Sequence, residues 1–368
     1  MPKHLICSAL LIGIYCAYVS IYARNVLNTP ENHHNLTTAI APLQKDQCNT
    51  VRTVFYNTEN LFHPSDDSIA MDEDFTPSGP YHWTYSRYYA KINKIGKLFV
   101  AIGEGCLPAL IGLCEIENRK VLEDILKKSV MKYHSYKIIH KESPDRRGID
   151  VAILYDPEQF MPLSYDFLNI EEVPTENLKT REILYVSGMF HNEALCHVFV
   201  NHWPSRRGGQ SASEYKRILA AQRLRKEIDS LLILDPDSNI IIMGDLNDEP
   251  LDVAVRKVLK SAGPESLDSG HYLVNLMFPM QKKGLGTHYR VNTITEAAVL
   301  DQILVSTSIF KGENGIKLFD DQAHIYRNVF LINKKNGRPL RTYQGLKYLG
   351  GFSDHLPVYT DFLIQIKQ

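Results

Sequence analysis

Cysteine is scarce in this sequence, with six residues in 368 and no C-x-x-C pair. The lack of that spacing argues against the common structural zinc sites. Cys114 and Cys196 lie in apolar, strand-like runs, where a free and buried thiol is the usual state. One disulfide in an oxidising compartment remains open, and no pairing is assigned.

The sequence also lacks an excess of either charge, since 41 Lys and Arg residues face 42 Asp and Glu residues for a net charge of -1. No global field therefore draws the chain onto nucleic acid or an anionic membrane, so any phosphate recognition must be local. Dibasic pairs at residues 146–147, 206–207 and 282–283 are candidates for such contacts. An isolated pair of this kind is more often a solvated part of the surface.

Long apolar runs are absent except near the N-terminus, where residues 5–23 follow Lys3 and His4 and precede a polar stretch. This pattern is typical of an export signal, and the run is also long enough to cross a bilayer as an uncleaved anchor. A lipidated Cys16 is a third alternative, although the small residue expected before it is missing. We therefore expect a signal peptide or signal anchor at 1–23, a linker at 24–49 and one domain at 50–368, in a protein that is periplasmic, secreted or membrane-anchored.

Strand-like and helical patterns alternate from residue 50 onward, and no internal repeat or second linker interrupts them. Apolar residues at helical spacing predict helices over 86–103, 119–130 and 211–234. Strand-like runs occupy residues 51–56, 109–114, 136–140, 149–155, 183–189, 195–201, 239–243, 299–305 and 358–364. This order predicts a single α/β domain.

Acids, amides and histidines follow several of these strands. Glu115 ends one apolar run, and Asp245 and Asn247 follow another after a glycine that allows a tight turn. Asp354 and His355 stand together before the last strand. Carboxylates and amides are hard oxygen ligands suited to Mg2+ or Mn2+. Taken alone, each signal is equally explained by a strand that exits into solvent or by a polar turn.

Seven short motifs together resemble the endonuclease/exonuclease/phosphatase superfamily, which includes pancreatic deoxyribonuclease, abasic-site endonucleases, inositol polyphosphate phosphatases and neutral sphingomyelinases. Each motif is short, but their shared order over residues 51–358 argues strongly against coincidence. The motifs are FYNTENLF at 55–62, IGLCEIEN at 111–118, RGIDVA at 147–152, VNHW at 200–203, GDLN at 244–247, LDQIL at 300–304 and SDHLPV at 353–358.

The resemblance implies a four-layered α/β/β/α sandwich whose active site lies at one edge of the paired sheets. It also implies a metal site with Glu115 as the principal ligand. Asn57 and Glu59 would lie near the same ion, and Asp354 would lie at the metal end of the site. Arg147, beside a glycine, is a further candidate because a guanidinium can donate to a phosphate oxygen.

The resemblance assigns the remaining candidates to the phosphate and the attacking water. His355 matches a histidine that contacts the scissile phosphate, and Asp301 matches the acid that orients it. Asp245 and Asn247 match the pair that positions or deprotonates water and binds a phosphate oxygen. His202 matches the second phosphate-contacting histidine of the deoxyribonuclease and phosphatase branches.

Two features fit the resemblance less closely. Asp150 places a charge where the superfamily usually has a small apolar residue. The aromatic residues at 81–85 are rich enough for a base-stacking wall, but packing against the helix that follows is their expected role.

These patterns predict an exported phosphoesterase that requires Mg2+ (or Mn2+) and has nucleic acid as its substrate, because a secreted nuclease needs no elaborate specificity. The alternative is a phosphatase or phospholipase C-like activity on inositol phosphates or sphingolipid headgroups. An inactive binding protein is a weaker alternative, since such a protein has no need to keep the whole candidate set. We expect a monomer with no stable protein partner and with membrane contact only through an uncleaved N-terminal segment.

Overall fold

The computed structural model describes residues 50–65, 71–170, 179–191, 194–266, 273–289 and 297–365. The expected signal or anchor and the linker lie outside these residues. Among the described residues, no helix has the length and apolar character needed to cross a membrane. Residues Cys48 to Gln368 make up one unit, and all of the following refers to it.

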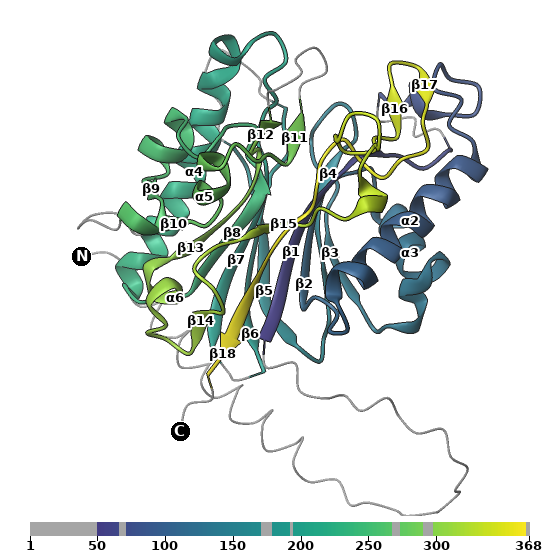
Figure 1. Cartoon of the computed structure of the whole chain (residues 1–368). Helices are drawn as coiled ribbons and strands as arrows, with labels where there is room; N and C mark the ends of the chain where they lie inside the picture. The colour runs from purple at the N-terminus through teal and green to yellow at the C-terminus, as the bar shows by residue number, and fades with distance from the viewer. Residues whose placement is uncertain are drawn as a thin grey trace, which may run out of the picture. The chain divides into compact units, whose positions relative to one another are not determined.

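Two large β-sheets pack against each other in the middle of this unit (Figure 1). The first sheet has the order β14 (Ile316–Leu318), β18 (Val358–Ile364), β1 (Thr50–Leu61), β2 (Leu110–Ile116), β4 (Asp150–Tyr155) and β3 (Lys137–His140), with β15 (His324–Ile325) also paired to β18. The second has the order β5 (Phe160–Leu168), β6 (Ile183–Phe190), β7 (Leu195–His202), β8 (Ile240–Asp245), β13 (Asp301–Ser306), β10 (Leu273–Asn275) and β9 (Ser261–Ala262).

Helices cover the outer face of each sheet. The helices α2 (Tyr85–Gly103) and α3 (Arg119–Lys128) pack on the first sheet, and α4 (Gln210–Leu234) packs on the second (Figure 1). This arrangement is the predicted α/β/β/α sandwich, which is thereby confirmed.

The remaining elements are short. The helices are α5 (Phe278–Lys282) and α6 (Thr307–Lys311), with 3-10 turns at Glu73–Phe75, Val130–Tyr133, Pro264–Ser266 and Val329–Leu331 and a π-helical turn at Ala254–Val258. Two ribbons of two strands each are formed by β11 (His288–Tyr289) with β12 (Ala297–Ala298) and by β16 (Tyr343–Gln344) with β17 (Lys347–Tyr348).

The hydrophobic pattern of the sequence explains the layers. Strands such as β8 are buried along their whole length and carry apolar side chains toward both faces. On α2, Ile92, Ile95 and Phe99 are buried against the first sheet at helical spacing, and Thr84 caps the helix by accepting a hydrogen bond from the Arg87 N–H. Burial of these side chains fixes the sheets, and with them the positions of the strand ends.

The elements that the sequence did not predict are short or lie at an edge. β5 pairs only with β6, and most of its residues are half-buried or exposed. It also contains Pro162 beside a bulge in the β5–β6 register, a position that an edge strand tolerates. The strands between residues 316 and 348 are two or three residues long, which is too short to show a period.

The cysteines follow the expectation in part. Cys114 and Cys196 are free and buried, as predicted. Cys106 is disulfide-bonded. The structure therefore contains a disulfide, which the sequence had left as one alternative.

Candidate active site

The register of the second sheet places three predicted site residues next to one another. In the parallel pair β7–β8, His202 lies opposite Asp245, and in the antiparallel pair β8–β13, Asp245 lies opposite Asp301. All three are buried. Because residues directly opposite each other in a sheet project to the same face, these side chains meet at one end of the second sheet.

The first sheet supplies the opposite wall of this site. The strands β1 and β2 run parallel and carry Asn57 and Glu115 to the same end. The Asn57 Nδ2 atom lies 3.3 Å from Glu115 Oε1 and 3.0 Å from Asp245 Oδ2. One amide therefore joins a carboxylate of each sheet.

The strand ends on this wall have an uncommon backbone conformation. Glu59, Asn60 and Glu115 have φ angles of 54°, 48° and 59°, in the left-handed region that non-glycine residues rarely adopt. The Asn60 N–H donates to Glu115 Oε2 at 2.7 Å, which holds the two strand ends together. Backbone strain of this kind is concentrated at functional sites.

His355 is hydrogen-bonded to Asp301. The His355 Nδ1 atom lies 2.7 Å from Asp301 Oδ2, and its Nε2 atom lies 3.9 Å from Asp245 Oδ2. Burial lowers the pKa of His355, but Asp301 and the neighbouring acids Asp245 and Asp354 outweigh burial, and the pKa stands well above its usual value. This imidazole is therefore held as a cation that points its other nitrogen toward the site.

His202 has the opposite electrostatic character. Its Nε2 atom lies 3.8 Å from Glu115 Oε1 and 3.9 Å from Asp245 Oδ2. Burial, together with the positive charges of Arg181, Arg147 and His355, lowers the pKa of His202 well below its usual value. The site thus holds one charged and one neutral histidine on either side of Asp245, and among the described residues His202 Nδ1 has no hydrogen-bond partner.

Asp245 occupies the centre of the arrangement. Its Oδ1 atom accepts the Asn247 N–H at 2.9 Å. Burial raises the pKa of Asp245, as does the charge of Asp301, while His355 lowers it, and the result is a pKa of about 6. A carboxylate with a pKa near neutrality is suited to accept a proton from water.

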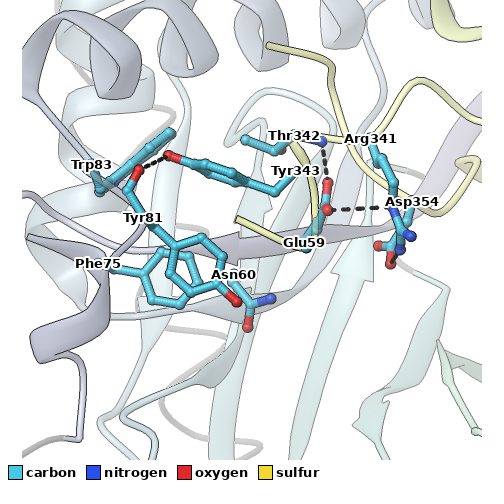
Figure 2. A pocket seen from close by; sticks show the side chains of 10 residues that line it. Glu59, Asn60, Phe75, Tyr81, Trp83, Arg341, Thr342, Tyr343 and Asp354 are labelled. Atoms are coloured by element: carbon cyan, nitrogen blue, oxygen red, sulfur yellow. Dashed lines mark hydrogen bonds and ion pairs between the residues drawn. The ribbon is translucent and has the colours of Figure 1, made fainter. Parts of the chain in front are cut away.

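Glu59 and Asp354 form a second acidic pair beside this centre, and Arg341 binds both (Figure 2). The Glu59 Oε2 atom also accepts the Thr342 N–H at 2.6 Å. Burial and the charge of Asp354 raise the pKa of Glu59 to about 7. Burial would raise the pKa of Asp354, but the nearby cations His355, His288 and Arg341 lower it to about 2.

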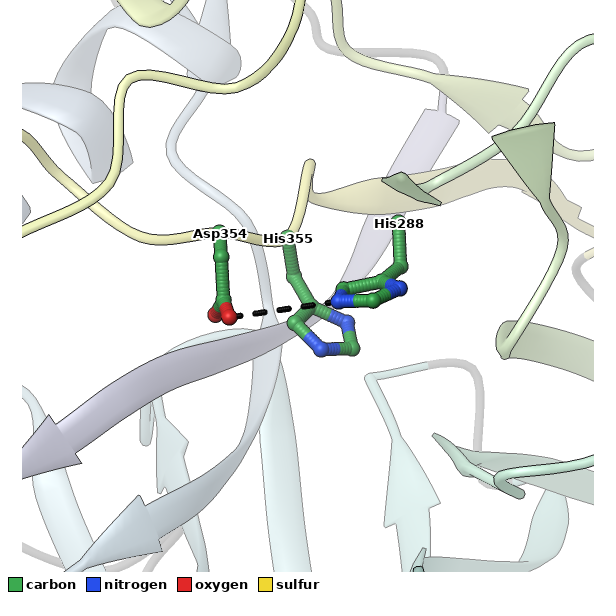
Figure 3. A group of neighbouring side chains, drawn as sticks. All are labelled: His288, Asp354 and His355. Carbon is green, nitrogen blue, oxygen red and sulfur yellow. Dashed lines mark ion pairs between the residues drawn. The ribbon is translucent and has the colours of Figure 1, made fainter. Parts of the chain in front are cut away.

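Sequence reasoning missed His288 and Arg341. His288 lies at an isolated bridge to His355, with ring centroids 4.7 Å apart, and its Nε2 atom lies 3.9 Å from Asp354 Oδ2 (Figure 3). Burial and His355 lower the pKa of His288 to about 4. Both missed residues lie on short loops and ribbons without periodicity, so no sequence signal distinguishes them from surface residues.

Two residues singled out by sequence lie away from the centre. Arg147 Nε lies 3.3 Å from Asp145 Oδ1, and Arg147 lines a neighbouring cavity rather than contacting the central carboxylates. Asp150 is buried and pairs with His140 Nε2 at 2.9 Å, and it accepts the Ser143 N–H. Its charge, which departs from the family pattern, thus anchors a loop next to the site.

A buried ion pair supports the loop that carries Asn247. Arg217 Nε donates to Asp248 Oδ1 at 2.6 Å, and both residues are almost fully buried. Arg206 Nε donates to the Asn247 carbonyl at 2.6 Å. The Asn247 amide donates to the Trp203 carbonyl at 3.0 Å, so this loop is held from both sides.

We expect Arg217→Met to lower the free energy of unfolding by about 3 kcal/mol, because it leaves the buried Asp248 carboxylate with only the longer contact to Arg206 Nη2 at 3.4 Å. Urea denaturation measures this change. Arg223→Met on the same helix removes a partly exposed pair with Glu227 and should cost at most about 1 kcal/mol. Equal losses for the two variants would contradict a structural role for the buried pair.

The donor set fits a hard divalent cation. Within the described residues, the ligand atoms of two groups lie within 4.8 Å of one another, namely His288, Asp354 and His355, and Asp245, Asp301 and His355. Glu115 and Asn57 face the same space from the first sheet. Burial is the main cause of the raised pKa values of Glu59 and Asp245, and the charges of Asp354 and of Asp301, respectively, raise them further. A cation with oxygen ligands would neutralise this negative charge.

The fold and this acidic, histidine-containing edge define a metal-dependent phosphoesterase built on two packed sheets. The chain belongs to the endonuclease/exonuclease/phosphatase family, whose profile matches residues 52–364. The resemblance inferred from the seven motifs is therefore confirmed. By this membership the chain is a divalent-metal-dependent hydrolase acting on ester bonds.

Solved structures share the fold at low sequence identity. The chain is similar to humanized D. rerio TDP2 (TM-score 0.53, 13% identity, covering 85% of this chain and 99% of that chain). It is also similar to a Bacteroides thetaiotaomicron endonuclease/exonuclease/phosphatase family protein (0.51, 15%, 86% and 98%) and to the human Nocturnin catalytic domain with bound sulfate (0.52, 14%, 86% and 94%). No curated protein matches the sequence.

Proposed function

We propose that the chain is an exported, Mg2+-dependent nuclease that hydrolyses phosphodiester bonds of nucleic acid. The observation that carries the chemistry is the placement of Asp245 between a cationic His355 and a neutral His202, with Nε2 atoms 3.9 Å from the same carboxylate oxygen. This arrangement offers a proton acceptor beside two groups that can face a phosphate. Phosphoryl transfer requires little more of a protein than positioning and charge neutralisation.

In this mechanism Asp245 accepts the proton of the attacking water, and the Asn247 N–H and the Asn57 amide keep its carboxylate oriented. The imidazolium of His355 neutralises charge that develops on the phosphate oxygens, and Asp301 keeps it protonated. Glu115, with Asn57, would hold the metal ion. When bound, the ion polarises the phosphate and offsets its charge. Glu59 and Asp354 are paired with Arg341, so Glu115 is the principal ligand in this proposal.

Nucleic acid is the proposed substrate for two reasons. One of the similar structures is D. rerio TDP2 complexed with a single-strand DNA product (TM-score 0.50, 14% identity). The acidic edge is also flanked by an aromatic pocket on the side of the first sheet. Metal-dependent cleavage of single-stranded and plasmid DNA, measured beside phosphate release from inositol phosphates and turnover of sphingomyelin, tests the proposal. It fails if nucleic acid is untouched while a headgroup is hydrolysed.

One observation favours the headgroup phosphatase as a second candidate. A cavity of about 310 Å³ has Arg147, Lys179, Arg207 and Lys216 in its lining. A cluster of cations can bind additional phosphate groups of a polyphosphorylated ring, although it serves the backbone of a nucleic acid equally well. Charge reversal at Arg207 and Lys216 should raise KM more than it lowers kcat for whichever substrate is turned over.

We expect Glu115→Gln to weaken the metal dependence and the rate together, because the carboxylate supplies much of the charge that binds the ion. Removing a group that merely supports a metal ligand typically costs about 10- to 100-fold in metal affinity, and losing the ligand should cost at least as much. Titration of activity and of ion binding with Mg2+ and Mn2+ measures both effects. Glu142→Gln, at an exposed position, is the matched control, and wild-type activity of Glu115→Gln in chelator would refute the assignment.

Export is supported by the apolar run at residues 5–23 and by the disulfide of Cys106, since disulfides persist in oxidising compartments. Fractionation of cells that produce the full chain, with N-terminal sequencing of the product, distinguishes a cleaved signal from an anchor. A full-length product in the reducing compartment, with a Cys106 thiol that reacts with alkylating agents, would contradict export.

A further inference from the structure

A cavity of about 200 Å³ adjoins the acidic edge and shares Glu59 and Asp354 with it (Figure 2). We call it the ring pocket. Its walls come from the segment before α2 and from residues 341–345, at the start of the β16–β17 ribbon. Besides the two acids, Asn60, Phe75, Tyr81 and Tyr343 line it.

Aromatic side chains form a rigid wall of the ring pocket. Phe62, Phe75 and Tyr81 form a continuous stack, with ring centroids 4.6 and 4.4 Å apart and interplanar angles of 25° and 14°. Tyr343 meets Tyr81 edge-on at 4.9 Å, and its hydroxyl donates to the Tyr81 carbonyl at 2.9 Å. Tyr81 is therefore fixed in place before any ligand binds, which lowers the entropic cost of stacking on it.

The aromatic residues at 81–85, which the sequence analysis took together, differ in their surroundings. Trp83 is 1% exposed and donates its indole N–H to the Phe62 carbonyl at 2.8 Å, so it packs into the core as expected. Tyr81 is only half-buried and lies at the pocket. Trp83 touches the pocket but is mainly a core residue, and Tyr81 is available for a ligand.

Asn60 connects the ring pocket to the predicted metal site. Its backbone N–H donates to Glu115 Oε2 at 2.7 Å, while its side chain lies at the pocket beside Tyr81 (Figure 2). An amide offers one acceptor and two donors, which suits the polar edge of a nucleobase. The ring pocket and the carboxylate assigned to the metal ion are therefore linked through one residue, so a single substrate molecule can reach both.

We propose that the ring pocket binds a nucleobase of the cleaved strand, stacked in the aromatic wall of Phe75, Tyr81 and Tyr343 with its polar edge at Asn60. This inference rests on the proposed nuclease activity and names the part of the substrate that the site recognises. Base stacking on aromatic side chains contributes affinity and tolerates all four bases. The pocket therefore gives the enzyme a preference for a base-bearing nucleotide at one position, with little preference for sequence.

The charges of the ring pocket disfavour one of the two headgroup alternatives. Glu59 and Asp354 repel the extra phosphates of an inositol polyphosphate, and the one cation of the lining, Arg341, is already paired with both acids. The quaternary ammonium of a choline headgroup would suit an aromatic pocket with two acids, but it offers no polar edge to the Asn60 amide at the pocket. A flat ring with a polar edge uses both the aromatic wall and the Asn60 amide.

The test uses short, end-labelled single-stranded DNA in which one abasic tetrahydrofuran residue is moved through the sequence. For the wild-type protein we expect kcat/KM for cleavage at a given bond to fall by about tenfold or more when the abasic residue occupies one fixed position relative to that bond. An abasic residue at any other position should change kcat/KM little. The position that matters identifies the nucleotide in the ring pocket.

Tyr81→Leu keeps an apolar side chain but removes the stacking surface. This variant should lose the positional effect. On a strand with abasic residues throughout, it should have the same cleavage rate as the wild-type protein has on that strand. A variant with a general folding defect would be slower there as well. Tyr81→Phe should restore the positional effect. Tyr133→Ala, at a residue that is 76% exposed, is the control.

Three outcomes would overturn the proposal. One is cleavage of DNA without any positional effect of the abasic residue. Another is a positional effect that Tyr81→Leu retains. The third is turnover of a phosphocholine lipid that Tyr81→Leu abolishes, which would assign the pocket to a quaternary ammonium. If no nucleic acid is cleaved at all, the proposed function itself fails, and this result is distinct from cleavage that ignores the base.

Discussion

We expect Asp245→Asn to lower kcat by about 10²- to 10⁴-fold, the range for loss of general base catalysis. The substitution removes the proton acceptor and keeps the shape of the side chain. The oxygen of the new side chain can still accept the Asn247 N–H. In the wild-type protein the Asn57 amide donates to Asp245 Oδ2 at 3.0 Å, and in the variant it would face a second amide group instead. A small loss of stability is therefore expected beside the large loss of rate, and thermal unfolding separates the two.

The pH profile gives an independent test of the same assignment. Asp245 acts as a base only when ionised, and its pKa of about 6 means that kcat/KM should fall as the pH drops through about 6. A bound cation would move this limb to lower pH, so it is best measured at several metal concentrations. Asp245→Asn should remove the limb, whereas Asp237→Asn, at an exposed position, should keep it. A limb that survives in Asp245→Asn would assign the base elsewhere.

The periodicity of the sequence was sufficient to predict an α/β domain, and the strand ends indicated one part of the candidate site. The arrangement of two packed sheets came from the family resemblance. Long strands and helices carry their own periodicity, and β8 or α2 bury the same faces that their apolar residues indicate. Asn57, Glu115 and Asp245 lie directly after or within such strands, so that sheet register alone brings them to one edge. These site residues could therefore be recognised in the sequence because they lie within or directly after regular strands.

The parts that could not be predicted depend on contacts between distant, irregular segments. Arg341 reaches Glu59 and Asp354 from a loop, and His288 stacks near His355 from a two-residue strand. The opposite charge states of His202 and His355 are likewise invisible in the sequence. They arise because Asp301 lies against one histidine, while burial and nearby arginines act on the other.

We expect His355→Ala to lower turnover by about 10²-fold or more, because it removes the cation proposed to face the phosphate. Asp301→Ala should cost a similar factor, since Asp301 is buried and its Oδ2 atom lies 2.7 Å from His355 Nδ1. If Asp301 acts only through this imidazole, the double variant should be little slower than His355→Ala alone. Losses that multiply would show that Asp301 has a separate function.

The pH dependence shows how Asp301 acts on His355. The pKa of His355 is raised well above its usual value, so the imidazolium persists through neutral pH and activity should decline only in the basic range, as the pH passes the raised pKa. Asp301→Asn removes the charge that raises this pKa, so the basic limb of kcat/KM should move to lower pH. His134→Ala, at an exposed histidine, should leave the limb in place. An unmoved limb in Asp301→Asn would mean that Asp301 orients the ring without holding its proton, and the loss of rate in that variant would then be geometric.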